Sequence, residues 1–433
     1  MQLLTQILKQ INDYVWGLPL ICLLLGTGIY FTFKLRLIQL TKLKLAFKCI
    51  FKKQEGDGDV SSFQALCTAL SSTIGTGNIV GVATAIAAGG PGALFWMWIS
   101  AFFGMATKYA EGLLAIRYRQ KDENGEIAGG PMYYLEKGLH SPLLAKIFAF
   151  FGVSVALLGI GTFTQVKSIS DGLSMSLNVP RYITAILLTI AVAFITIGGI
   201  KRIASVAEKV IPLMCVLYIG GVVLILVSHI TVLPSAIALI IKSAFTPQAV
   251  FGGGTGITMV IAMQKGISRG IFSNESGLGS APIAAAAAKT DSCVEQGLVS
   301  MTGTFIDTIV ICTMTGFIVI MAHRWAMEPE AWKAAGTYPK FLLSIGSMTP
   351  GVLNELVMIL VSVCFCLFAY TCVIGFITFS EISANRISDS RSFIQFIRGL
   401  GVFVAAFGIF CNIAGYDLSN LWAFSDLGNI IIV

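Results

Sequence analysis

Long apolar runs separated by short polar segments dominate the chain, and this pattern predicts helices that cross a membrane. A helix needs about 20 mostly apolar residues to span the hydrocarbon core. Residues 60–107 contain no Lys, Arg, Asp or Glu, so they must form two helices, with Gly89-Gly90-Pro91-Gly92 as the turn between them. We predict eleven spans, at 15–33, two within 60–107, 147–166, 182–200, 210–229, 246–264, 297–322, 356–380, 399–416 and 418–433. The last of these is short for a crossing.

Two of the predicted spans are interrupted by glycine-rich stretches, STIGTGNIVG at 71–80 and FGGGTGITMV at 251–260. Glycines in the middle of a membrane helix allow the backbone to open and expose its amides and carbonyls. Both stretches contain the tripeptide GTG, which is weak evidence alone because the chain has 45 glycines. Their positions within the spans are the stronger signal and predict two broken helices.

The composition agrees with a polytopic membrane protein. Of the 433 residues, 56% are hydrophobic and 12% are charged, against about 25% charged in a typical soluble domain. The net charge of +7 needs no nucleic-acid partner, because basic residues between spans are topology signals. The ten cysteines form no CxxC pair, so we expect no disulfide framework and no transition-metal site. The first apolar run is expected to be a retained span rather than a signal peptide.

The distribution of basic residues orients the predicted bundle. Segments 34–60, 117–146, 199–209, 264–296 and 381–398 hold 21 of the 29 Lys and Arg, and alternate segments fall on one side of the membrane. Because cytoplasmic loops carry the excess of basic residues, we expect the N-terminus outside and the C-terminus in the cytoplasm of a bacterial-type plasma membrane.

The spans divide into one peripheral helix, 15–33, and two sets of five, at 61–229 and 246–433. Since five is odd, the second set must run opposite to the first, and each set opens with a glycine break. Paired broken helices in inverted repeats place a binding site near the middle of the bilayer. The expected fold class is therefore an all-α polytopic membrane protein forming one transmembrane domain.

Several long segments closely resemble the alanine/glycine:cation symporter family, also called sodium:alanine symporters. They are STIGTGNIVGVATA from Ser71, GGPGALFWMWISAFFGMATKYAE from Gly89, RGIFSNESGLGSAPIAAAAAKT from Arg269 and QGLVSMTGTFIDT from Gln296. The similarity covers most of residues 60–380. It implies an inner-membrane carrier with the leucine-transporter fold that imports a small neutral amino acid with sodium.

Candidate substrate-binding residues lie at the glycine breaks. A substrate carboxylate needs converging amide and side-chain donors, which an unwound segment can supply; close helix packing would explain the glycines but not their polar neighbours. Gln165 is either an interhelical contact or a ligand, and the family pattern favours the ligand. Phe376 stands where the family usually has tryptophan, so either the substrate size preference or the ion affinity is expected to differ. The candidates are Gly75, Thr76, Gly77, Asn78, Gln165, Gly254, Thr255 and Phe376.

For sodium, the resemblance implies a pair of hydroxyls in the ninth span that act together with the first broken helix. Thr371 fits this role, whereas Cys372 offers sulfur, which a hard cation does not prefer. The candidate ion ligands are Thr73, Ile74, Gly77, Thr371 and Cys372. No cofactor other than sodium as the coupling ion is expected.

Asp307 is an acidic residue deep within an apolar span, where a charge costs about 2.5 to 3.5 kcal/mol. It is interpreted either as a coupling or gating carboxylate or as a structural partner of Lys108 or of a hydroxyl cluster. Asn274 and Glu275 are interpreted either as an inner gate or as a capped turn. Lys108 and Glu111, three residues apart, are expected to form a surface pair.

The function predicted from these observations is symport of alanine or glycine with sodium by a monomer. An enzyme is not expected, since Asp307 has no visible catalytic partner among the spans. Two alternatives stay open, a proton-coupled carrier and a family member that has lost transport, the second suggested by Cys372 and the short final span.

Overall fold

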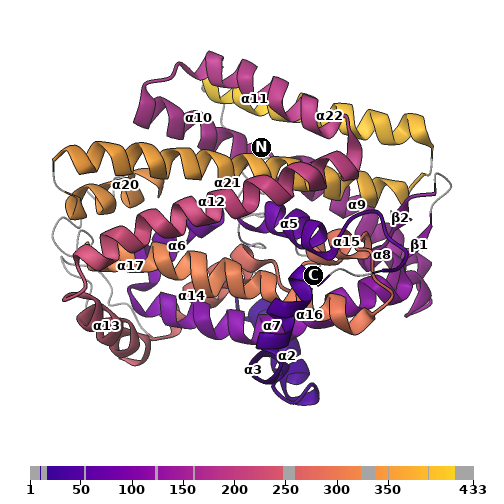
Figure 1. The fold of residues 1–433 in the computed structure, drawn as a ribbon, viewed down its shortest axis with the longest axis horizontal. Coiled ribbons are helices and arrows are strands. Elements are labelled where there is room, and N and C mark those ends of the chain that lie inside the picture. Colours follow the sequence, from indigo (N-terminus) through magenta and orange to yellow (C-terminus); the bar gives the residue numbers. More distant parts are fainter. Residues whose placement is uncertain are drawn as a thin grey trace.

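The chain folds into a bundle of helices with one short β-hairpin, as the computed structural model shows (Figure 1). It describes residue 10 and residues 17–52, 55–121, 125–158, 161–246, 259–322, 337–349, 351–388 and 390–414. The all-α membrane class predicted from the sequence is confirmed. The predicted last span at 418–433 lies outside the described residues. So does the predicted second glycine break at 251–260, except for its last two residues, which begin α14.

The elements of the first half follow in chain order. They are α2 (Leu18–Lys34), α3 (Ile38–Thr41), α4 (Leu43–Phe51), α5 (Ser62–Thr73), the 3₁₀ turn η1 (Thr76–Asn78), α6 (Val80–Gly89), α7 (Gly92–Tyr118), β1 (Gln120–Lys121), β2 (Ile127–Ala128), α8 (Pro131–Lys137), α9 (Pro142–Leu158), α10 (Phe163–Leu177), α11 (Arg181–Thr196) and α12 (Gly199–Ser228). The strands are antiparallel, with Gln120 opposite Ala128. Helix α6 ends at Gly89 and α7 begins at Gly92, which confirms the predicted turn.

In the second half, the elements among the described residues are all helices. They are α13 (Leu233–Phe245), α14 (Met259–Asn274), α15 (Ser280–Ala286), α16 (Cys293–Thr304), the π-helical segment η2 (Phe305–Cys312), α17 (Thr313–Met321), α20 (Thr337–Met348), α21 (Val352–Asn385) and α22 (Arg391–Ala414). Helix α14 continues for ten residues beyond residue 264, the predicted end of a span, so the helix is longer than the apolar run. Helical hydrogen bonding does not stop where the apolar run stops, so Lys265 and Arg269 lie within the helix.

Among the described residues, five helical stretches are long and apolar enough to cross a membrane, and the first of them includes α9 and most of α10. They are Pro142–Ser174, Gly199–Ser228, Cys293–Met321, Asn354–Asn385 and Arg391–Ala414. A sixth candidate is the bent pair formed by α5 with η1 and α6.

The helices pack in two groups with α5 between them. Helices α7, α14 and α16 pack together on one side, while α10, α11, α12, α21 and α22 form the other, and α5 contacts α12, α15, α16 and α21 (Figure 1). Gly266 lets α14 approach α7 closely, since a Cβ there would lie 2.3 Å from the Ala93 carbonyl oxygen. Helix α5 thus contacts both groups. A movement of one group against the other would change the contacts of α5.

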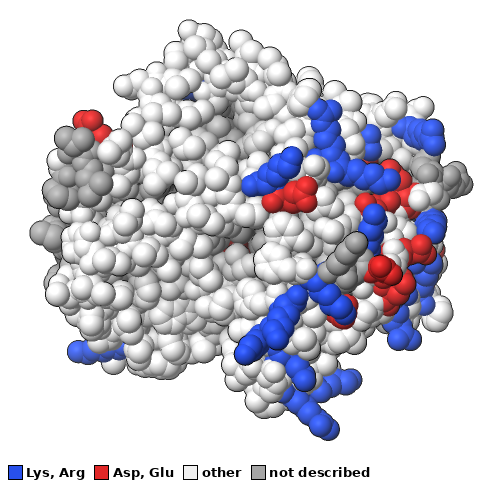
Figure 2. All heavy atoms as spheres, viewed as in Figure 1, with Lys and Arg blue, Asp and Glu red and all other residues white. Residues whose placement is uncertain are grey.

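Charged side chains gather toward one end of the bundle on the face shown in Figure 2, the end at which α8, β1 and β2 lie in Figure 1. Most of the remaining face is uncharged, as expected for a surface in contact with lipid. The gathering of basic residues at this end follows the sequence-based assignment of the cytoplasmic side, which stays a prediction.

Candidate functional site

The predicted break in the first repeat is present. Helix α5 ends at Thr73, and the axis turns by 65° before η1 and α6 continue. At the turn, the Gly75 N–H donates a hydrogen bond of 2.9 Å to Asn78 Oδ1, so a side chain replaces the lost helical acceptor. Thr76 and Asn78 are both buried here. The backbone therefore opens in the interior of the protein, where each freed polar group needs a partner.

The Asn78 side chain reaches across to Asp307. Its Nδ2 donates to Asp307 Oδ1 at 2.5 Å. The other carboxylate oxygen accepts hydrogen bonds from Ser273 Oγ at 3.0 Å and Thr308 Oγ1 at 2.7 Å. Asp307 is fully buried, and these donors compensate part of the cost of removing a carboxylate from water. Of the two structural partners considered for Asp307, Lys108 and a hydroxyl cluster, the structure shows the hydroxyl cluster.

Asp307 lies in η2, a π-helical stretch between two α-helices. Such segments are frequent at functional sites, because the extra residue per turn re-aims side chains that a regular helix would place elsewhere. Here it lets Asp307 and Thr308 both face the break. Sequence reasoning gave no sign of the π-helical turn.

A second chain of hydrogen bonds fixes the Asn78 backbone. Thr315 Oγ1 donates to the Asn78 carbonyl at 2.8 Å, and the Tyr218 hydroxyl lies 2.6 Å from Thr315 Oγ1. Thr315 and Tyr218 are buried and were not predicted as site residues, nor were Ser273 and Thr308. Ser273 and Thr308 do stand in the family-like segments, which was the available signal.

Two further predicted residues converge on the break from other helices. Gln165 on α10 accepts a hydrogen bond from the Thr76 N–H at 3.3 Å. Cys372 on α21 donates from its thiol to the Ser72 carbonyl at 3.1 Å. A Cβ at Gly75 would lie 3.0 Å from Cys372 Sγ and 3.4 Å from Gln165 Oε1. The structure thus brings Gly75, Thr76, Gln165 and Cys372 together.

Other predicted ion ligands face elsewhere. Thr371 Oγ1 donates to the Leu367 and Phe368 carbonyls of its own helix and lies 3.8 Å from Met214 Sδ. Thr73 Oγ1 donates to the Ala69 carbonyl. Neither hydroxyl contacts Cys372 or Asp307. Ile74 is fully buried directly after α5.

Gly77 and Phe376 border the site from two sides. A Cβ at Gly77 would lie 3.7 Å from the Phe272 ring, so Gly77 faces α14. Phe376 packs against Gly161, just before α10, with its ring 6.2 Å from that of Phe379. Gly254 and Thr255, the candidates in the second break, lie outside the described residues.

Asn274 and Glu275 form the turn that links α14 to α15. Asn274 Oδ1 accepts a hydrogen bond from the Ser276 N–H at 3.0 Å, and its Nδ2 donates to Thr308 Oγ1 at 3.2 Å. Ser280 Oγ donates to the Glu275 carboxylate. These side chains stabilise the turn, but α15 begins after Gly279 without a side-chain cap, so the capped turn and the inner gate both stay open. Through Thr308 the turn is connected to Asp307.

The expectation that Lys108 and Glu111 form a surface pair is wrong. Their exposed fractions are 2% and 7%, because α14, α15 and α16 cover this part of α7. Lys108 Nζ lies 4.0 Å from Glu111 Oε2 and has no hydrogen-bond partner among the described residues. Lys108 also lines a cavity behind α5, together with Thr73, Asn274, Gln296 and Ser300.

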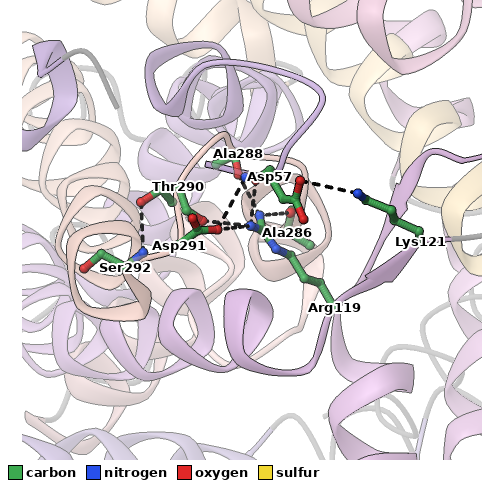
Figure 3. A network of polar contacts seen from close by, with 8 residues as sticks. All are labelled: Asp57, Arg119, Lys121, Ala286, Ala288, Thr290, Asp291 and Ser292. Atoms are coloured by element: carbon green, nitrogen blue, oxygen red, sulfur yellow. Dashed lines mark hydrogen bonds and ion pairs between the residues drawn. The ribbon is translucent and has the colours of Figure 1, made fainter. Parts of the chain in front are cut away.

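Arg119, at the end of α7, joins two loops near the start of α5 (Figure 3). Its guanidinium donates to the carbonyl oxygens of Asp57, Ala286, Ala288 and Thr290, at 2.6, 3.0, 2.7 and 2.8 Å. It also pairs with Asp291 at 3.6 Å. Burial lowers the pKa of Arg119 from its ordinary value, and Asp291 and Asp57 oppose this shift.

Backbone hydrogen bonds hold the same two loops together. Val60 forms a parallel bridge with Ala288, and the Lys289 N–H donates to the Val60 carbonyl at 2.7 Å. Since α5 begins at Ser62, these contacts tie one end of the broken helix to the loop that follows α15. We call the Arg119 contacts with these loops the Arg119 clamp.

We expect Gly75→Ala to destabilise the protein and reduce its transport. The new methyl group would lie 3.0 Å from Cys372 Sγ, and overpacking of this kind costs about 1 to 3 kcal/mol. Gly81→Ala is the matched control, because a Cβ there meets nothing within 4 Å. Thermal unfolding in detergent and uptake by reconstituted vesicles measure the two effects. If Gly75→Ala and Gly81→Ala unfold at the same temperature and transport equally, a methyl group fits at Gly75 without overpacking.

The sequence is similar to known transporters along its whole length. The sequence profile of the sodium:alanine symporter family matches residues 1–433. An uncharacterized transporter of Haemophilus influenzae is 48% identical over 427 residues, covering 98% of this chain and 90% of the relative. The sodium/alanine symporter AgcS of Methanococcus maripaludis is 44% identical over 430 residues, covering 98% and 91%. A probable sodium/glutamine symporter of Bacillus subtilis, GlnT, is 37% identical over 436 residues, covering 100% and 87%.

The fold resembles solved transporter structures. The crystal structure of MhsT in complex with L-phenylalanine aligns with a TM-score of 0.53 at 16% sequence identity, covering 88% of this chain and 89% of that one. This likeness confirms the leucine-transporter-like fold. The protein is a transporter rather than an enzyme, and its activity is cation-coupled amino-acid symport. The broken helix and the buried carboxylate are consistent with the similarity along the whole sequence. The chain belongs to the sodium:alanine symporter family.

Proposed function

We propose that this protein imports a small neutral amino acid, alanine or glycine, together with sodium. The observation that carries the proposal is the contact between Asn78, in the broken helix, and the buried carboxylate of Asp307. It joins the segment with open backbone to a cluster of side-chain oxygens suited to a hard cation. The buried thiol of Cys312 borders this cluster, with its Sγ 3.2 Å from Ser273 Oγ and 3.5 Å from Asn78 Nδ2. Ion and substrate would therefore act on the same turn of backbone.

The sodium ligands we propose first are oxygens of Asp307, Ser273, Thr308 and Asn78. They come from α14, η1 and η2 and lie within one hydrogen-bonded cluster. An amide oxygen and nitrogen can exchange places by a side-chain flip, which would turn Asn78 Oδ1 toward the cluster. The earlier set, with Thr73, Ile74, Gly77, Thr371 and Cys372, is retained as a second position at the α5 and α21 contact. Its weakness is the sulfur of Cys372.

The substrate carboxylate is proposed to bind at the Gly75 and Thr76 amides. Both N–H groups now have side-chain acceptors, Asn78 Oδ1 and Gln165 Oε1. A carboxylate could replace these acceptors, after which Gln165 would be free to contact the ligand. Phe376 and the second break at Gly254 and Thr255 are proposed to enclose the amino-acid side chain.

The architecture proposed for this function has a peripheral helix at 15–33 and inverted repeats at 61–229 and 246–433. We propose a monomer in the plasma membrane with the N-terminus outside and the C-terminus in the cytoplasm. Support comes from the break in the first repeat and from the basic residues at one end of the bundle.

Proton coupling is the second candidate. Among the described residues four carboxylates are buried, and Glu381 pairs with Arg398, which leaves Glu111, Glu275 and Asp307 with one buried lysine, Lys108. Such an excess of acid calls for a bound cation or a proton. Sodium is preferred because Asp307 is surrounded by hydroxyl and amide groups. Relatives of this chain include a sodium/alanine symporter and a probable sodium/glutamine symporter, so glutamine is the substrate to compare with alanine and glycine.

Uptake by vesicles reconstituted with the purified protein tests the proposal. Radiolabelled alanine and glycine should accumulate under an inward sodium gradient, and glutamine should accumulate less. Replacing sodium by choline should abolish uptake at every proton gradient tested. Uptake that follows the proton gradient without sodium would favour proton coupling, and no uptake with either ion would favour a non-transporting protein.

A further inference from the structure

A basic helix face lies between the first span and the broken helix. Lys44, Lys48 and Lys52 recur every four residues at and just after α4, so they share one side of this helix. Lys42, just before α4, is also exposed. Residues 34–54 contain no Asp or Glu. In Figure 2, basic side chains gather at the projecting lower end where α2 and α3 lie in Figure 1. We call Lys42, Lys44, Lys48 and Lys52 the basic face of α4.

The opposite side of α4 is fixed to the bundle. Ala46, Cys49 and Ile50 are buried, and α4 packs against α16. The Phe47 ring lies 5.6 Å from the ring of Phe305 in an edge-on contact. The helix therefore cannot rotate to bury its lysines, and the basic face is held outward.

Large apolar side chains are exposed beside these lysines. The exposed fractions are 64% for Leu40, 46% for Leu45 and 77% for Phe51. A helix that combines exposed lysines with exposed Leu and Phe fits the boundary between lipid headgroups and acyl chains. A soluble acidic partner would account for the lysines but would leave these apolar groups without a role.

We propose that the basic face of α4 binds anionic phospholipid headgroups, with Leu40, Leu45 and Phe51 in the adjoining acyl region. This inference goes beyond the transport function and does not depend on it. The face is also connected to the site. Phe51 contacts the Phe63 ring of α5 at 5.6 Å, and Lys52 pairs with Glu295 of α16. Headgroup binding would thus position α4 against the start of the broken helix.

The test is lipid retention by the purified full-length protein. The triple variant Lys42→Gln, Lys44→Gln, Lys48→Gln removes three charges and leaves the Lys52 pair intact. The control variant Lys137→Gln, Lys146→Gln, Lys209→Gln removes three exposed lysines elsewhere. Phosphatidylglycerol and phosphatidylcholine are offered in mixed detergent micelles, and native mass spectrometry measures the bound lipid.

We expect the α4 variant to lose phosphatidylglycerol affinity by roughly fivefold for each lysine removed. The control variant should retain it, and phosphatidylcholine binding should not change. Equal retention by the α4 variant and the native protein would overturn the proposal, as would an equal loss in the control. The lipid measurement does not require the protein to transport. If no preparation shows uptake, that result contradicts the proposed function and leaves the lipid proposal unaffected.

Discussion

Replacing Asp307 by Asn should weaken the sodium dependence of substrate accumulation by at least about tenfold. The change keeps the size of the side chain but removes the buried negative charge that faces Asn78, Ser273 and Thr308. Interactions with a charged group contribute about 1.5 to 3 kcal/mol, so the half-maximal sodium concentration should rise at least about tenfold. Uptake by reconstituted vesicles over a range of sodium concentrations measures the shift.

Asp171→Asn serves as the control for this substitution, because Asp171 pairs with Arg181 and is partly exposed. It should leave the sodium dependence unchanged. Ser273→Ala and Thr308→Val should each produce a smaller shift than Asp307→Asn, since each removes one neutral oxygen. If Asp307→Asn folds normally and keeps the native sodium dependence, the ion is held elsewhere, and the contact between α5 and α21 becomes the first candidate.

Much of the fold could be predicted because the signals are local. Glycines at 75 and 77 mark the break, and the turn at 89–92 follows from its Gly and Pro residues. The count of eleven spans and the inverted repeat depend on segments beyond the described residues, and they stay predictions.

The interior of the site was harder to predict because it depends on packing between distant helices. Lys108 and Glu111 have the spacing of a surface pair, yet α14, α15 and α16 bury both. Asp307 could be selected as a buried charge, but its hydroxyl partners depend on the π-helical turn of η2. Thr371 was chosen by family likeness, and its helical position turns the hydroxyl toward Met214 instead of α5.

Arg119→Met should impair sodium-driven accumulation by opening the Arg119 clamp. Arg119 donates to carbonyls of both loops that meet at the start of α5, and methionine cannot donate. One charge-assisted hydrogen bond contributes about 1.5 to 3 kcal/mol. If the two loops at the start of α5 can separate, losing the Arg119 contacts should shift the equilibrium toward the separated state by at least about tenfold. Substrate should then leave preloaded vesicles faster in the absence of sodium.

Two further variants distinguish the loss of the Arg119 hydrogen bonds from the loss of a positive charge. Arg119→Lys keeps the charge but not the planar fork that reaches several carbonyls at once, so its efflux should lie between those of the native protein and Arg119→Met. Lys121→Met removes a nearby basic residue that is 59% exposed and pairs with Asp57, and it should behave like the native protein. Efflux from preloaded vesicles and thermal unfolding are measured together, so that a release of α5 is distinguished from general unfolding. Native accumulation and efflux in Arg119→Met would show that the backbone bridge between Val60 and Ala288 holds the loops without the guanidinium.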